Sequence, residues 1–209
     1  MRPLPLLAAA LAVSAAFPAL AAGKPARPPG KTQLIQRGGY LVRVAGCHDC
    51  HTPMRFDKEL GAPVPMMERM LSGHPADAPD PVGKYAQGDM GVMGATMTSF
   101  AMPFGIVYAP NLTPDVETGL GRWTEQQFMG ALRTGRHMGL EDGRPVLPPM
   151  PWPNLAAATD EDLRAIWAYL RSIPPVKNQV PENKVTPEAI AELEKVAGKM
   201  EAMMAKAKK

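Results

Sequence analysis

The sequence predicts an all-α fold, a small helical domain with long irregular loops. Several segments repeat apolar residues at helical spacing, and some of them also begin with helix-capping residues. No segment of useful length alternates apolar and polar residues as a half-buried strand does. The chain has 209 residues, 45% of them hydrophobic, and no internal repeat, so we expect one compact domain with tails.

The first 22 residues have the layout of a secretory signal peptide. Arg2 precedes an apolar run over residues 4–20, and small residues place a cleavage site near Ala21 or Ala22. An uncleaved membrane anchor is the alternative, but the run is short for a hydrocarbon core of ~30 Å, and no second spanning run follows. We therefore expect a soluble periplasmic protein with no integral membrane span after cleavage.

Charge and cysteine content narrow the function. Loss of Arg2 with the leader lowers the formal net charge by one from the +3 of the full chain. No stripe of basic residues with interleaved aromatics precedes the extreme C-terminus, so no nucleic-acid partner is expected. The only cysteines, Cys47 and Cys50, are too close in sequence to be a useful disulfide staple. We therefore expect the two thiols to take part in the chemical function of the protein and not in a structural disulfide.

The first half of the mature chain is expected to hold one helix and one long insertion. Residues 23–33 are rich in Pro, Gly and Lys and indicate a flexible lead-in. Apolar and small residues at helical spacing predict a helix over residues 34–45, which leads into Cys47. Residues 52–110 predict an irregular insertion with at most short helical turns, such as at 66–71. A loop of this length is unusual in a compact domain unless another group orders it, for example a large buried prosthetic group.

The second half is expected to be helical. A capping box at Thr124 and a glycine stop predict a helix over residues 125–134. The acidic residues after Thr159 begin a second helix, which carries an apolar stripe from Leu163 to Leu170. A third, amphipathic and Lys-rich, is expected to start at residues 186–187.

The expected domain plan follows from these elements. Residues 1–22 are the signal peptide and residues 23–33 the lead-in. The main helical domain is expected over residues 34–176, followed by a linker and a C-terminal helical tail over residues 177–209.

The five residues Cys47-His48-Asp49-Cys50-His51 fit the C-x-x-C-H pattern of haem c attachment. In one helical turn, two thiols three residues apart can reach the two vinyl groups on one porphyrin edge, while the imidazole of His51 points at the iron. We therefore expect one covalently bound haem c, attached through Cys47 and Cys50, with His51 as the proximal iron ligand.

Three other interpretations use the same cysteines. A thioredoxin-like pair needs a βαβ surround, which the sequence does not offer. A structural zinc site needs a second pair of ligands, whereas no further cysteine exists and His74 and His137 stand alone. A chance match is disfavoured because the only two cysteines of an exported chain both fall in the pattern.

A haem iron that only transfers electrons is usually six-coordinate, so a distal ligand is also expected. Most of the 15 methionines are typical packing residues. Met150 stands apart because prolines frame it on both sides and would hold a weak thioether ligand with little entropy left to lose. We expect Met150 to be the distal iron ligand. The second candidate is His137, and the open alternatives are Met138, Met102 and His74.

The attachment segment, residues 38–53, resembles that of bacterial periplasmic class I-like c-type cytochromes, and within them the modules of the multihaem cytochrome subunits of alcohol and gluconate dehydrogenases. Two further segments are similar to that family, residues 110–124 and residues 149–163. The resemblance implies a cytochrome c-like fold wrapped around the haem, and Met150 as distal ligand. The chain departs from the family in carrying one attachment motif, which implies a single-haem carrier.

Two axial protein ligands leave no open iron position, which favours electron transfer over substrate chemistry. We therefore expect no enzyme activity but a carrier between redox proteins, such as a dehydrogenase, other cytochromes or a terminal oxidase. One alternative is a haem enzyme or sensor with an open distal site, similar to a peroxidase. Another is a methionine-rich periplasmic copper-binding protein. The walls of the haem pocket could include Trp123, Trp152, Tyr108 and Phe104, with Asn111 or Arg122 near a propionate.

Overall fold

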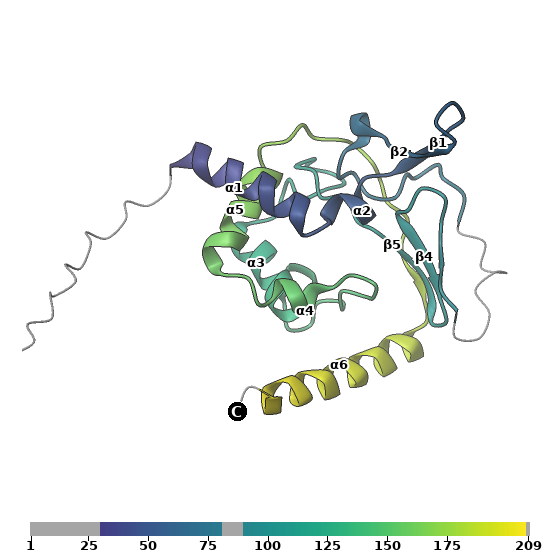
Figure 1. Cartoon of the computed structure of the whole chain (residues 1–209). Coiled ribbons are helices and arrows are strands. Elements are labelled where there is room, and N and C mark those ends of the chain that lie inside the picture. The colour runs from purple at the N-terminus through teal and green to yellow at the C-terminus, as the bar shows by residue number, and fades with distance from the viewer. Residues whose placement is uncertain (1–29, 81–89, 208–209) are drawn as a thin grey trace, which may run out of the picture.

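A computed structural model describes residues 30–80 and 90–207 of the chain (Figure 1). The expected signal peptide and most of the expected lead-in therefore lie outside the described residues. None of the described helices has the length and apolar character needed to cross a bilayer.

The expectation of an all-α fold is wrong. The described part of the chain holds six α-helices together with two antiparallel sheets, so the fold is mixed. One sheet is a hairpin of β1 (Met54–Asp57) and β2 (Ala62–Pro65). The other has the strand order β3-β4-β5-β6, formed by β3 (Val92–Met93), β4 (Ser99–Met102), β5 (Gly105–Tyr108) and β6 (Lys184–Val185).

These strands show no alternating pattern in the sequence because each is only two to four residues long. Their positions depend on the turns between them and not on the pattern of their side chains. In the first hairpin, Asp57 Oδ1 accepts hydrogen bonds from the amides of Glu59 and Leu60, at 2.9 and 3.0 Å. Gly61 follows with φ +64°, which a glycine adopts without strain. β6 is further hidden because its partner β5 lies far away in the sequence.

The helices agree with the sequence pattern. α1 spans Lys31–Val44, α3 spans Glu125–Thr134, α5 spans Asp160–Leu170 and α6 spans Pro187–Ala207. The capping box at Thr124 is present, with the amide of Gln127 donating to Thr124 Oγ1 at 3.2 Å. Shorter pieces are α2 (Cys47–His51), α4 (Trp152–Leu155), and the 3₁₀ turns η1 (Met67–Arg69) and η3 (His137–Gly139).

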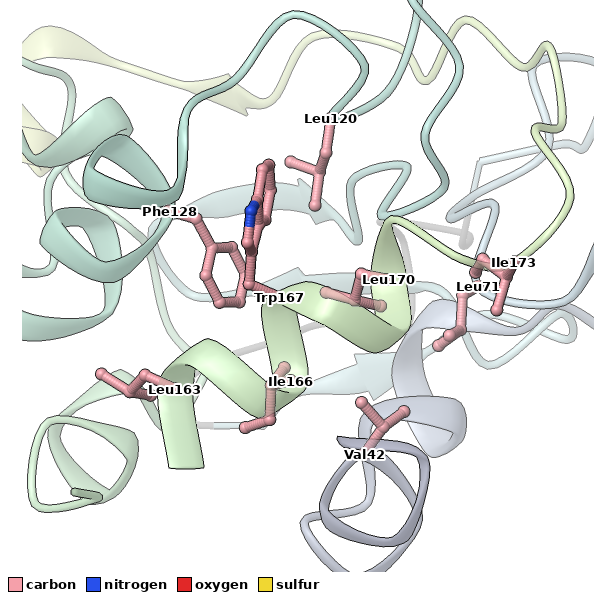
Figure 2. Close-up of a cluster of buried hydrophobic side chains, with 9 residues drawn as sticks. All are labelled: Val42, Leu71, Leu120, Phe128, Leu163, Ile166, Trp167, Leu170 and Ile173. Carbon is pink, nitrogen blue, oxygen red and sulfur yellow. The ribbon is translucent and has the colours of Figure 1, made fainter. Parts of the chain in front are cut away.

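The hydrophobic core lies where α1 and α5 cross, with α3 beside them (Figures 1 and 2). Gly38 of α1 lets the two helices approach closely, since a Cβ there would lie 1.9 Å from the carbonyl oxygen of Ala165. Figure 2 shows Val42 of α1 facing the apolar face of α5. The remaining core residues are Leu71, Leu120, Phe128, Leu163, Ile166, Trp167, Leu170 and Ile173. Leu71 belongs to the 52–110 insertion, so this insertion is part of the core.

Candidate haem-binding site

His51 ends α2 as a buried imidazole held in one orientation. Its Nδ1 lies 2.9 Å from the carbonyl oxygen of Pro110, which can only accept, so Nδ1 carries the proton and donates. The other nitrogen, Nε2, is then left with its lone pair in the neutral ring. Burial lowers the pKa of His51 below its ordinary value, which favours that neutral form. A neutral imidazole with a fixed Nδ1–H is the state that ligates a metal.

The attachment motif follows a sharp turn between α1 and α2. Gly46 makes this turn with φ +68°. Neither Cys47 nor Cys50 is in a disulfide, and both are half-buried. Burial raises the pKa of Cys47 to about 11 and also raises the pKa of Cys50, so both thiols are protonated at neutral pH.

A cavity of about 710 Å³ opens beside α2, within the range of small-molecule and cofactor sites. Cys50 and His51 line one part of its wall, whereas Cys47 packs against the hydrophobic core. Most of the lining is apolar and comes from α3, β5 and the loops around them, among them Leu120, Trp123, Phe128, Ala131, Leu132, Val107 and Leu147. Such a lining suits the faces of a flat, largely apolar ligand.

Met150 lies on the same cavity as His51. Its loop is tied down on both sides, because the Met150 amide donates to the carbonyl of Leu147 and the Met150 carbonyl accepts from the amide of Trp152. The Trp152 ring packs against Gly135 at the end of α3, since a Cβ on Gly135 would lie 2.2 Å from a ring atom of Trp152. The fold thus brings Met150 to the same cavity as the α2 motif, although the two lie far apart in the sequence.

The other distal candidates divide into two groups. His137 also lines the cavity, where its ring contacts Trp123 edge-on with centroids 4.9 Å apart. His74, Met102 and Met138 are not among the lining residues in the part of the chain that the structure describes. His74 is instead fully buried in a polar cluster, hydrogen-bonded through Nδ1 to Thr98 Oγ1 at 3.0 Å. The geometry leaves Met150 and His137 as the two candidates on the cavity.

Cytochrome subunits of bacterial dehydrogenases are among the known proteins that are similar to this chain. The chain is 32% identical over 152 residues to the cytochrome c subunit of alcohol dehydrogenase (quinone) of Gluconobacter oxydans. It is 29% identical over 144 residues to the gluconate 2-dehydrogenase cytochrome c subunit of Pantoea cypripedii, and 29% identical over 152 residues to the fructose dehydrogenase cytochrome subunit of Gluconobacter japonicus. The chain resembles dehydrogenase cytochrome c subunits.

The similarity to these cytochrome subunits covers most of this chain but little of theirs. The three matches span 71%, 68% and 72% of this chain, yet only 24% of each relative. The chain therefore corresponds to about a quarter of each relative's length. No protein-family model matches it.

The residues of this cytochrome c-like chain fit a haem. The cavity combines an apolar lining with a buried imidazole that has one nitrogen already committed to a backbone carbonyl. It also brings a thiol of the C-x-x-C-H motif and a thioether to its wall. The donor set is thus a neutral nitrogen and a soft sulfur, a pair that suits haem iron.

Sequence reasoning found some lining residues and missed others. Trp123, Tyr108 and Asn111 line the cavity, whereas Trp152, Phe104 and Arg122 are absent from the described lining. The side-chain amide of Asn111 is already hydrogen-bonded within the protein, because its Nδ2 donates to the Val176 carbonyl at 2.8 Å. Missed lining residues include Arg144 and the chain segment over residues 179–183. No local pattern marks them, because residues 179–183 follow the predicted domain and Arg144 lies in a loop.

Proposed function

We propose that this chain is an exported c-type cytochrome with one haem, which passes single electrons between redox proteins. The observation that carries the proposal is the pairing of the fixed imidazole of His51 with Met150 on one apolar cavity. The names of the relatives, which are cytochrome c subunits of dehydrogenases, point the same way.

Each proposed site residue has one task. Cys47 and Cys50 form the two thioether bonds that keep the cofactor attached. His51 supplies Nε2 as the proximal ligand, and the Pro110 carbonyl keeps its Nδ1–H in place. Met150 supplies the distal thioether. Haem c, when bound, supplies a one-electron iron couple.

The proposed function is transfer of electrons and not catalysis on a substrate. If His51 and Met150 both held the haem iron, a small molecule would find no free position on it. The mostly apolar lining would surround the haem faces with few groups that rearrange when the iron changes charge.

We also propose the setting in which the protein works. The leader over residues 1–22 would deliver it to the periplasm, where thiols can be matured into haem attachments. A dehydrogenase, another cytochrome or a terminal oxidase would serve as its redox partner. The tail from residue 186 forms α6, and its Ile190 lines the proposed haem cavity.

The test is a combined cofactor count and ligand-binding measurement on protein matured in a host that attaches haem c. We expect one haem per chain, a reversible one-electron couple and slow, weak cyanide binding to the ferric protein. Rapid cyanide binding to a high-spin ferric protein would instead establish the open-site enzyme or sensor. Purified protein without haem that takes up several tight equivalents of Cu(I) would establish the copper-binding protein.

A further inference from the structure

The 52–110 insertion returns to the proximal side of the site at one short segment, residues 71–74, which we call the strap. All four strap residues, Leu71, Ser72, Gly73 and His74, are buried. The strap lies between two pieces of chain that the His51–Pro110 hydrogen bond also joins.

Backbone hydrogen bonds fix the strap to both pieces. On the His51 side, the Gly73 amide donates to the His51 carbonyl at 2.8 Å, and the Leu71 amide donates to Thr52 Oγ1 at 3.0 Å. On the opposite side, the His74 amide donates to the Ala109 carbonyl at 3.0 Å. The Leu112 amide completes the set by donating to the Leu71 carbonyl at 2.9 Å.

Gly73 brings the strap into direct contact with the carbonyl that holds His51. Its φ is +77°, and a Cβ at this position would lie 2.5 Å from the Ala109 oxygen and 2.7 Å from the Pro110 oxygen. No side chain fits there. Any outward movement of the strap would therefore change the position of the Pro110 carbonyl relative to His51 Nδ1.

Asn178, a buried residue in the chain after α5, holds the strap by side-chain hydrogen bonds. Its Nδ2 donates to the carbonyls of Ser72 and His74, at 2.8 and 2.9 Å. Its Oδ1 accepts from the Ala76 amide and from Arg69 Nη2, both at 3.1 Å. All four hydrogen-bonding positions of the amide are used in a side chain that is 4% exposed.

We propose that Asn178 and Gly73 are positioning residues for the proximal ligand. Asn178 fixes the strap in place through its hydrogen bonds, Gly73 allows the strap to reach the Ala109–Pro110 peptide, and together they set the strength of the His51–Pro110 hydrogen bond. This inference rests on the proposed function. A stronger bond at Nδ1 makes the imidazole a better electron donor and stabilises the ferric iron, so the strap tunes the reduction potential.

The test compares neutral variants, so that no charge is added near the iron. Asn178→Ser removes the two bonds to the strap carbonyls, and Gly73→Ala inserts a methyl group against Ala109 and Pro110. Gly61→Ala is the matched control, because Gly61 also has positive φ but has nothing within 4 Å of an added Cβ. Either test variant suffices if the other does not fold.

Three readouts are measured on the full chain: the reduction potential, the proton resonance of His51 Nδ1–H, and the hydrogen exchange of the Gly73 amide. We expect the potential to rise in both test variants, the Nδ1–H resonance to shift, and exchange of the Gly73 amide to speed up roughly tenfold. Gly61→Ala should leave all three as in the parent. Faster Gly73 exchange with an unchanged potential and Nδ1–H resonance would overturn the inference.

The same design separates this inference from the proposed function. If the parent chain carries no covalent haem, the proposed function fails. The Nδ1–H resonance of His51 then still decides whether Asn178 and Gly73 position the imidazole, since that measurement needs no haem.

Discussion

The imidazole of His51 offers one nitrogen to the cavity because the other is already used. The motif spacing predicted His51 as a ligand, and the hydrogen bond to the Pro110 carbonyl explains how its tautomer is fixed. The sequence could not predict this acceptor, since it lies 59 residues away and any backbone carbonyl could have filled the role. For the same reason, local patterns predicted roles for Cys47, Cys50 and Met150 but gave no signal at Asn178 or Gly73.

Replacement of Met150 by Leu tests the distal ligand. The side chain keeps its volume but loses its sulfur, so we expect the ferric protein to lose the sulfur-to-iron absorption band in the far red and to bind cyanide readily. A fall in reduction potential should accompany this change, because a thioether ligand raises it.

His137→Leu is the matched variant, since His137 lines the same cavity. It should retain the far-red band and the slow cyanide binding of the parent. Loss of these features in His137→Leu, with Met150→Leu unchanged, would assign the distal position to His137.

At the scale of elements, the closest approach in the core is the crossing of α1 and α5 at Gly38. Gly38→Ala should lower the free energy of unfolding by about 2 kcal/mol or more, because the methyl group meets rigid backbone. Gly198→Ala in α6 is the control, where nothing lies within 4 Å of the added Cβ and helix propensity improves. Chemical denaturation of the two variants checks this, and equal stabilities would show that the helices do not pack as described.

The cap of α5 gives a second prediction at this scale. Thr159 Oγ1 accepts a hydrogen bond from the Asp162 amide at 3.1 Å, and α5 carries five buried residues. Thr159→Ala should therefore cost about 1 kcal/mol of global stability. Thr186, which caps α6 through the Ala189 amide, is the comparison, because none of the described α6 side chains is buried. Thermal unfolding of the two variants measures this difference. If Thr186→Ala lowered the unfolding temperature as much as Thr159→Ala does, the prediction that the α6 cap contributes less to stability would be wrong.

Helices were predictable from the sequence because each carries its own signals. The capping box at Thr124 and the glycine after Thr134 mark α3, and its predicted bounds of 125–134 are confirmed. Strands carry fewer local signals. β2 contains two prolines among its four residues, and β6 forms only by pairing with the distant β5. The fold class was therefore wrong in the insertion and the tail, where structure depends on contacts between remote segments.

At the scale of the whole molecule, the cavity draws its walls from segments spread from Cys50 to Ile190. Without a bound group these apolar walls lose contacts, so haem attachment should stabilise the entire fold. We expect the chain produced without haem attachment to unfold about 10 °C or more below the haem-bearing form of the same sequence. Calorimetry of the two forms measures this difference. Identical unfolding temperatures would mean that the cavity is not a haem site.

The central claim is a covalent bond between a haem and the α2 turn, and a denaturing gel stained for haem tests it most directly. Protein matured in a host that attaches haem c should stain at the position of the chain, and a Cys47→Ala/Cys50→Ala double variant from the same host should not. An unstained parent chain, run beside a known c-type cytochrome that does stain, would contradict the account.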